Sequence, residues 1–375
     1  MPSKKLNILS VFGTRPEVIK MAPVIKELEK HPDQFVSRVC VTGQHRQMID
    51  PLLKLFGIKP DFDLDIMQKN QNLDHITTTV LVKVGQLIDE EKPDYVFVQG
   101  DTTSAMAAGL TAFYRKVKVA HVEAGLRTWD IHHPFPEEVN RRIIDSFADL
   151  YFAHTEAAKT NLIKEGVREE RIEVTGNTVI DALLETVAKP FDLKTILPKS
   201  FLKPDRKLIL VTAHRRENFG DPILDICSGL KELAVRFPDE VAFVYPVHLN
   251  PNIQKPVKEL LTGVNNILLT EPLEYLPFVH LMKQSYLILT DSGGLQEEAP
   301  SLGKPVLVLR QTTERPEGVQ AGCVQVIGTE TLSMIRHVEG LLLDRKLYNR
   351  MSQAVNPYGD GRASKRIVQR MLREK

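Results

Sequence analysis

Three acidic residues stand where apolar, strand-like segments give way to loops. Asp101 follows the segment 95–99, Glu123 ends the segment 117–123, and Glu137 follows a further loop. Loops at strand ends are where proteins usually mount reacting groups. Carboxylates that converge there raise one another's pKa by mutual repulsion, which general acid and base catalysis requires. The pattern therefore predicts a site that moves protons.

The charge of Glu123 needs a partner, because the residue stands between a valine and the small pair Ala-Gly at a strand end. We expect Arg127 or Arg141 to be that partner. The other acids also have simpler interpretations. Asp101 is a candidate N-cap of the helix that follows it, and Glu138 is a candidate solvated helix residue.

A first candidate anion site lies near the start of the chain. The segment 13–17, GTRPE, follows the strand-like segment 6–12, and Lys20 stands one turn into the helix expected at 16–30. Glycine permits a sharp backbone turn, and a helix N-terminus beside Arg15 attracts negative charge. The segment therefore favours phosphate binding, with a plain strand-to-helix turn carrying surface cations as the alternative.

A second candidate phosphate site has Ser292, Gly293 and Gly294 between a strand-like segment and a helix. Two glycines before a helix allow a phosphate to approach the backbone N–H groups closely. Glu298 suits the ribose hydroxyls of a nucleotide, although an early helix acid also complements the helix dipole. Neither a GxGxxG fingerprint nor a Walker sequence is present, so the sequence indicates no NAD or ATP cofactor.

Basic residues also follow the strand-like segment 207–213, in the run 214–216, HRR. Consecutive basic residues at a strand end suggest a diphosphate ligand. His248 follows another strand-like segment and lies either beside this cluster or beneath it. The pair His132-His133 lacks the spacing of a metal site, so we expect no bound metal.

Short apolar runs alternate with longer amphipathic segments in both halves of the chain, which indicates βαβ units and parallel sheets. We expect an α/β protein of two Rossmann-like, doubly wound domains, residues 1–180 and 181–359. Their ligand cleft should lie at the carboxyl ends of both sheets. The proline-rich segment 188–205 is the expected linker, and a helix within 360–375 should pack back onto the first domain.

The composition is that of a globular protein, with 42% apolar and 26% charged residues among 375. A net charge of +1 argues against a nucleic-acid coat or a membrane-surface protein. Three scattered cysteines, an N-terminus without an apolar targeting segment and no apolar run near the ~20 residues of a membrane span predict a cytoplasmic protein.

The motifs taken together resemble the non-hydrolysing UDP-N-acetylglucosamine 2-epimerases. They occur in order from about residue 12 to residue 318 and read FGTRPEVIKMAPV, VTGQHRQM, QGDTTSA, HVEAGLRT, PFPEEVNRR, VTGNTVIDA, VTAHRRENFG and TDSGGLQEEAPSLGKPVLVLRQTTERPE. The resemblance implies a GT-B fold, the two-Rossmann architecture of many nucleotide-sugar glycosyltransferases, and a homodimer. It also implies action on UDP-GlcNAc and UDP-ManNAc, with no nucleic-acid or membrane partner.

The resemblance also implies roles for individual residues. The catalytic residues of the family match Asp101, Glu123, Glu137 and His214. Its substrate-binding residues match Arg15, Lys20, Arg141, Ser292, Gly293, Gly294, Glu298 and Arg315. Some bacterial members have a second UDP-GlcNAc site that activates the enzyme, and its residues match Gln44, Gln47, Glu137, Arg215 and His248.

The chemistry of such an enzyme accounts for these residue types. The C2–H bond of an N-acetylhexosamine is not next to a carbonyl, so direct removal of this proton would give an unstabilised carbanion. Transient oxidation is one way around this, but it needs NAD, whose fingerprint the sequence lacks. In the other route a base removes the proton while UDP leaves C1. The product is a 2-acetamidoglucal, to which UDP adds again after the proton returns from the opposite face. Alternatives are a modified UDP-HexNAc substrate, a hydrolysing 2-epimerase, a GT-B glycosyltransferase or a catalytically silent UDP-sugar-binding protein.

Overall fold

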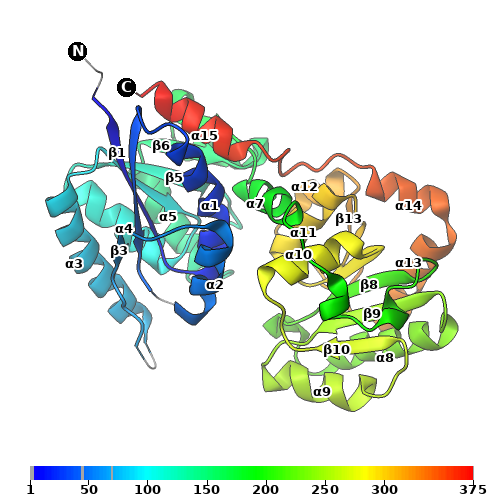
Figure 1. Ribbon diagram of the computed structural model, residues 1–375. Coiled ribbons are helices and arrows are strands. Elements are labelled where there is room, and N and C mark those ends of the chain that lie inside the picture. The colour runs from blue at the N-terminus through cyan, green and yellow to red at the C-terminus, as the bar shows by residue number, and fades with distance from the viewer. Residues whose placement is uncertain (1–3, 44–45, 69–70, 375) are drawn as a thin grey trace. The chain divides into compact units, whose positions relative to one another are not determined.

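The computed structural model describes residues 4–43, 46–68 and 71–374 (Figure 1). By their internal contacts these residues form two compact units, 1–182 with 358–375 and 183–357. The division falls within helix α7. The segment 188–205, which its prolines predicted to be a loose linker, therefore belongs to the second unit. Two of its side chains, Leu197 and Phe201, are buried there.

The first unit is built on a seven-stranded parallel sheet of order β3-β2-β1-β4-β5-β6-β7, with helices on both faces. Its strands are β1 (Leu6–Phe12), β2 (Phe35–Val41), β3 (Phe62–Asp63), β4 (Tyr95–Gln99), β5 (Lys118–Ala124), β6 (Leu150–Ala153) and β7 (Ile172–Val174). Its helices are α1 (Arg15–Glu29), α2 (Arg46–Phe56), α3 (Leu73–Glu91), α4 (Thr103–Tyr114), α5 (Glu137–Phe147), α6 (Glu156–Lys164), the first part of α7 (Thr178–Val187) and α15 (Ala363–Leu372).

The second unit is built on a six-stranded parallel sheet of order β10-β9-β8-β11-β12-β13. Its strands are β8 (Lys207–Thr212), β9 (Val241–Pro246), β10 (Ile267–Thr270), β11 (Leu287–Thr290), β12 (Val306–Val308) and β13 (Val324–Val326). Its helices are α8 (Asp221–Arg236), α9 (Pro251–Leu261), α10 (Tyr275–Gln284), α11 (Gly293–Glu298), α12 (Pro316–Gln320), α13 (Thr331–Leu343) and α14 (Arg345–Ser352).

Both sheets read as near-continuous apolar strands because helices cover their two faces. All five residues of β4 and all four of β11 are buried. In each doubly wound sheet the strand order reverses once, between β1 and β4 in the first unit and between β8 and β11 in the second. Ligands of such folds bind beyond the carboxyl ends of the strands at this reversal. The topology therefore brings 13–17 beside Asp101, and 214–216 beside Ser292.

The C-terminal helix α15 belongs to the first unit and packs against α1 (Figure 1). Its N-terminus is held by Asp181, a buried residue of α7. The Asp181 carboxylate accepts hydrogen bonds from the backbone N–H groups of Ala363 and Ser364, at 3.1 and 2.9 Å, and from the Ser364 hydroxyl at 2.6 Å. Among the described residues no helix is long and apolar enough to cross a membrane.

Replacing Asp181 with alanine should loosen α15, because two buried N–H groups would lose their acceptor at a cost of about 1–3 kcal/mol. We expect faster amide hydrogen exchange across residues 363–372 in Asp181→Ala. The control is Asp360→Ala, which removes the half-exposed ion pair with Arg366 and one hydrogen bond of 3.2 Å from the exposed N–H of Arg362. Because these contacts are exposed, it should change exchange in α15 much less than Asp181→Ala does. Equal protection of α15 in Asp181→Ala and the parent protein would contradict the anchor.

Candidate functional site

Glu123 is the most constrained acid of the first unit. It lies near the end of β5 with a left-handed backbone, φ +66°, where the pairing with β6 shifts register. The residue is only 9% exposed. Lys20 Nζ lies 2.6 Å from both carboxylate oxygens, Asn177 Nδ2 donates to Oε1 at 2.9 Å, and Gln99 Nε2 donates to Oε2. Such a backbone costs on the order of 1–3 kcal/mol, and contacts from several elements hold it.

Neither arginine expected beside Glu123 is among these contacts. Arg141 pairs with Asp101, Nη2 to Oδ2 at 2.8 Å, and its Nη1 lies 3.6 Å from Glu138 Oε2. Arg127 pairs with Asp145, Nη2 to Oδ2 at 2.7 Å. The predicted partner was therefore wrong. Lys20 takes this role because α1 starts directly after β1, at the same edge of the sheet as the end of β5.

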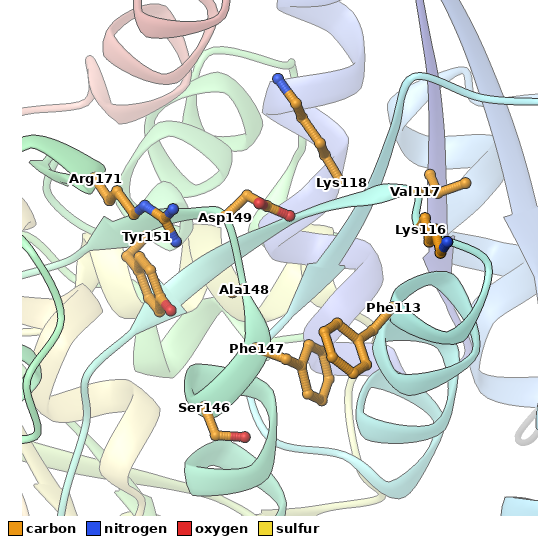
Figure 2. A pocket seen from close by; sticks show the side chains of 10 residues that line it. All are labelled: Phe113, Lys116, Val117, Lys118, Ser146, Phe147, Ala148, Asp149, Tyr151 and Arg171. Atoms are coloured by element: carbon orange, nitrogen blue, oxygen red, sulfur yellow. The ribbon is translucent and has the colours of Figure 1, made fainter.

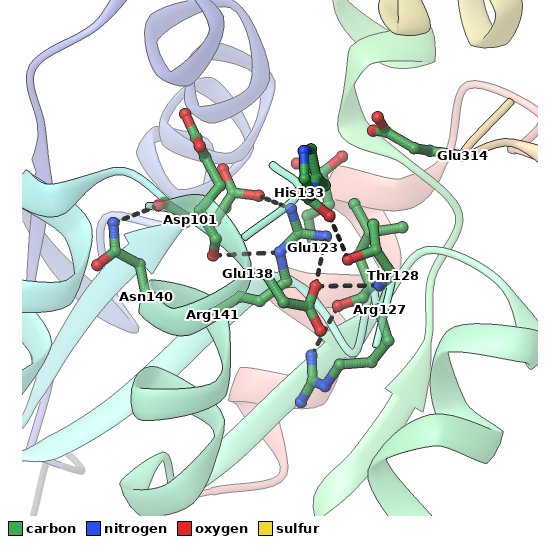
Figure 3. A network of polar contacts seen from close by, with 12 residues as sticks. Asp101, Glu123, Arg127, Thr128, His133, Glu138, Asn140, Arg141 and Glu314 are labelled. Carbon is green, nitrogen blue, oxygen red and sulfur yellow. Dashed lines mark hydrogen bonds and ion pairs between the residues drawn. The ribbon is translucent and has the colours of Figure 1, made fainter. Parts of the chain in front are cut away.

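The two consecutive acids at the start of α5, Glu137 and Glu138, have different surroundings. Glu137 is the first residue of the helix and is partly exposed, whereas Glu138 is completely buried. Glu138 accepts the backbone N–H groups of Thr128 and Trp129, at 3.0 and 3.2 Å, and so closes the loop that precedes the helix (Figure 3). The interpretation of Glu138 as a solvated helix residue was wrong.

The loop after β4 carries Asp101 and is tied down from α5. Arg141 holds the Asp101 side chain, and Asn140 Nδ2 donates to the Asp101 carbonyl at 3.0 Å (Figure 3). The N-cap of α4 is Thr102, whose hydroxyl accepts the N–H of Ala105 at 3.0 Å. Asp101 is therefore not the N-cap, and its carboxylate is directed to Arg141.

Sequence reasoning missed the role of Glu17. This glutamate of α1 is 1% exposed and accepts the backbone N–H groups of Gly13 and Thr14, at 3.0 and 2.7 Å. The Thr102 hydroxyl donates to it at 2.8 Å, which ties the loop after β1 to the loop after β4. Burial raises the pKa of Glu17 despite these hydrogen bonds. The signal was a glutamate three residues after a threonine, the capping-box spacing.

A buried acid has the same function in the second unit. Asp291, directly after β11, accepts the backbone N–H groups of His214 and Arg215 at 2.6 and 2.7 Å, and Asn218 Nδ2 at 2.9 Å. It therefore joins the basic run after β8 to the loop that carries Ser292. Its side chain supports the backbone of the site, and the sequence did not distinguish it from the residues beside it.

The basic run and its neighbours form a cluster suited to an anion. His248 is exposed and stacks on His214, with ring centroids 5.5 Å apart and an interplanar angle of 17°. A Cβ atom added to Gly293 would lie 3.6 Å from Arg215 Nη2, so only a short side chain leaves this guanidinium close to the backbone. Arg215 Nε is buried and has no hydrogen-bond partner among the described residues.

The remaining second-unit candidates lie around α11. Ser292 is the N-cap residue of this helix, and Gly293 and Gly294 are its first two residues. Glu298 is 8% exposed and accepts the Tyr275 hydroxyl at 2.8 Å. Arg315, which precedes α12, pairs with Glu297 of α11. The predicted phosphate and ribose contacts of these residues stay predictions.

The other sequence-predicted residues have separate surroundings. Arg15 is the partly exposed first residue of α1, beside the loop that Glu17 closes. Gln44 and the side chain of Gln47 lie outside the described residues. Of the residues matched to the second UDP-GlcNAc site, the structure therefore describes the side chains of Arg215, His248 and Glu137 only.

A surface pocket of about 440 Å³ lies away from all of these acids (Figure 2). Its walls include Lys118, the first residue of β5, and the stacked rings of Phe113 and Phe147. Glu123 lies near the opposite end of the same strand, and the pocket contains none of the predicted site residues. Its size alone therefore does not make it the candidate active site.

Two doubly wound sheets, each with acidic or basic loops at its strand reversal, define a GT-B-type fold. The coarse fold agrees with this class. A glycotransferase of kitacinnamycin, only 13% identical, superposes with a TM-score of 0.64 over 98% of this chain and 100% of its own. The predicted α/β, two-Rossmann architecture is thus confirmed.

The chain belongs to the UDP-N-acetylglucosamine 2-epimerase family, whose sequence profile matches residues 26–372. A UDP-N-acetylglucosamine 2-epimerase from Campylobacter jejuni is 53% identical over 377 residues, covering 98% of each chain. The crystal structure of the Neisseria meningitidis UDP-GlcNAc 2-epimerase bound to UDP-GlcNAc is 51% identical. It has a TM-score of 0.90 over 98% of this chain and 100% of that one. The predicted family is confirmed.

The pKa of His214 offers a test of the basic cluster. Burial lowers it, the charges of His248 and Arg215 lower it further, and Asp291 only partly opposes them. We expect the pKa of His214 to lie below the usual ~6.5. Arg215→Gln should raise it, because a neighbouring positive charge is removed.

NMR titration of the His214 ring in the ligand-free protein would measure both effects. The matched control is Arg236→Gln on α8, where the arginine pairs with the exposed Glu232. This control should leave the titration unchanged. A pKa of His214 at or above its usual value, insensitive to Arg215→Gln, would contradict the described cluster.

Proposed function

We propose that the protein interconverts UDP-N-acetylglucosamine and UDP-N-acetylmannosamine by reversible elimination and re-addition of UDP. Family membership over nearly the whole chain supports the overall reaction. The single observation that carries the mechanism is Glu123, a buried carboxylate at a strand end, held in a strained backbone and charge-paired with Lys20. Strained backbones and charge-paired buried carboxylates cluster at functional sites, which supports a chemical task for Glu123.

The first unit supplies the proton-transfer groups in this proposal. Inversion at C2 needs one group to remove the proton and another to return it from the opposite face. Asp101, Glu123 and Glu137 are the acids from which these groups are drawn. Lys20 lies within 3 Å of Glu123, and Arg141 lies within 3 Å of Asp101. The two cations hold these carboxylates in place and balance their negative charge while positive charge develops on the sugar ring.

The second unit holds UDP in this proposal. His214 and Arg215 would neutralise the departing diphosphate, and hydrogen-bond donors aimed at developing charge are worth ~3–4 kcal/mol each in comparable sites. The buried Nε of Arg215, which has no hydrogen-bond partner in the part of the chain that the structure describes, suits such an anion. Glu298 and Arg315 are assigned to the ribose and uridine portions, with Ser292, Gly293 and Gly294 against the phosphates. Arg15 is assigned to the same diphosphate.

The regulatory site and the assembly are part of the same proposal. Arg215, His248 and Glu137 would contact a second, activating UDP-GlcNAc. This assignment fails if UDP-ManNAc turnover is hyperbolic and insensitive to added UDP-GlcNAc. We place the enzyme in the cytoplasm, since Cys40, Cys227 and Cys323 are buried free thiols.

We further propose a homodimer through the face of α3 and α4. These two helices pack together, and Val82, Phe113 and Tyr114 on them are 58%, 51% and 66% exposed. Large exposed apolar side chains on two neighbouring helices are candidates for burial in an interaction surface. Tyr114→Ser should weaken the dimer in sedimentation equilibrium, and a monomeric parent protein would exclude it.

Incubation of the protein with UDP-GlcNAc in deuterated water, followed by proton and phosphorus NMR, tests the reaction. We expect UDP-ManNAc with deuterium at C2 and little free UDP. Stoichiometric release of UDP with free ManNAc would indicate a hydrolysing enzyme instead. No change in either direction would contradict the substrate and lead to modified UDP-sugars or to an acceptor screen for a transferase.

Glu123→Gln should lower kcat by about 10²–10⁴, the usual contribution of a general acid or base. UDP binding should stay near that of the parent protein, because no second-unit group changes. Steady-state kinetics and calorimetric titration with UDP measure the two effects. The control, Glu169→Gln, removes the exposed surface pair with Lys159 and should leave both unchanged. Undiminished turnover in Glu123→Gln would remove Glu123 from the mechanism.

A further inference from the structure

His121 is a wholly buried residue of β5 that neither the acids nor the basic cluster account for. Both of its ring nitrogens are engaged. Nδ1 lies 2.6 Å from Asp145 Oδ1, and Nε2 lies 2.7 Å from the carbonyl oxygen of Gly100.

Both neighbouring atoms of His121 accept hydrogen bonds and cannot donate them. A carbonyl oxygen has no proton, and an ionised carboxylate has none either. A neutral imidazole carries one N–H and one lone pair, so one of the two contacts would set a lone pair against an oxygen. Only the doubly protonated ring satisfies both contacts. The geometry therefore requires an imidazolium ion in the core of the first unit.

The charge nearest the His121 ring is the buried carboxylate of Asp145 on α5. Arg127 beyond β5 contacts the other carboxylate oxygen of Asp145 at 2.7 Å. Arg127 also pairs with Glu165, which follows α6, its Nε lying 2.9 Å from Oε1, and Arg142 Nε lies 3.8 Å from the same oxygen. Tyr151 on β6 donates its hydroxyl to the Asp145 backbone carbonyl and adds no charge. Two arginines thus share Glu165, and the charge of the imidazolium is balanced directly by Asp145.

The ionisation of Asp145 is consistent with this balance. Burial raises the pKa of its carboxyl, but the charges and hydrogen bonds of His121 and Arg127 outweigh burial and lower that pKa overall. Asp145 therefore stays an anion at neutral pH and keeps its demand for a proton on Nδ1 of the ring.

The second contact of His121 reaches the turn that carries Asp101. Gly100 has a left-handed backbone, φ +68°, and its N–H donates to the carbonyl of Val122 at 3.0 Å. Its carbonyl is held by His121. Gly100, the residue before Asp101, is thus fixed by β5 through both its N–H and its carbonyl. Asn140 and Arg141 then hold Asp101 itself.

We propose that His121 is a doubly protonated positioning residue, which holds the turn at Gly100 and thereby sets the carboxylate of Asp101. Its charge is held in place by Asp145, which also accepts the N–H of Gly125 at 3.2 Å. One buried acid therefore supports the loop of Asp101 through His121 and the segment after Glu123 directly. The part that concerns Asp101 rests on the function proposed above.

NMR of the protein with ¹⁵N-labelled histidine tests the charge without any activity measurement. We expect both ring nitrogens of His121 to carry protons at pH 7, because each faces an oxygen that can only accept a hydrogen bond. A neutral tautomer of His121 at pH 7 would overturn the proposal, whatever reaction the protein catalyses.

Kinetics of His121→Gln and Asp101→Asn, singly and together, test the positioning role. We expect His121→Gln to lower kcat about 10–100-fold, as a catalytic group misplaced by ~1 Å does, with KM little changed. The double variant should be no slower than Asp101→Asn, because coupled residues are not additive. Additive losses, or an unchanged kcat, would overturn the positioning role.

The matched control is His280→Gln on α10, a partly buried ring whose Nε2 lies 2.8 Å from the Lys189 carbonyl and whose centroid lies 5.6 Å from that of Phe191. It should keep the parent kcat. If His121→Gln fails to fold, the NMR experiment on the parent protein still decides the charge. In Asp145→Asn the amide can donate to the ring, so we expect one nitrogen of His121 to carry no proton at pH 7. A ring that kept both protons in that variant would contradict the role of Asp145.

Discussion

A carboxylate buried at the end of a parallel strand must find its counter-charge and its donors on other elements, because its own strand is committed to the sheet. Glu123 meets this constraint with Lys20 from α1, Gln99 from β4 and Asn177 from the turn before α7. These elements are adjacent only at the carboxyl edge of a doubly wound sheet. Glu123 can therefore be buried at this position only because the topology of the first unit brings these three partners to it.

The two units use the same device at their strand reversals. In each, a buried acid accepts backbone N–H groups of one loop and a side chain of another element, Glu17 in the first unit and Asp291 in the second. Such acids hold the loops in register, which leaves neighbouring groups to meet a ligand. Sites supported in this way keep reacting groups within the small tolerance that catalysis requires.

Several local predictions from the sequence were wrong for a shared reason. Arg127 and Arg141 were expected beside Glu123 because they follow it in the chain, yet they bind Asp145 and Asp101. Glu138 was expected in solvent because it begins a polar helix, yet it closes the loop before that helix. A charged side chain pairs with a residue that is close in space. Spacing along the chain predicts such a residue poorly when the two partners belong to different strands or helices.

The sequence by itself determined the family, the parallel α/β architecture of both halves and the segments in which reactive residues gather. It could do so because apolar periodicity and motif wording are local properties of the chain. Only the tertiary structure decided which acids have structural roles. Glu17, Asp145 and Asp291 look like their reactive neighbours in the sequence. Their roles depend on burial and on hydrogen bonds to elements far away in the chain, and these exist only after the sheets have formed.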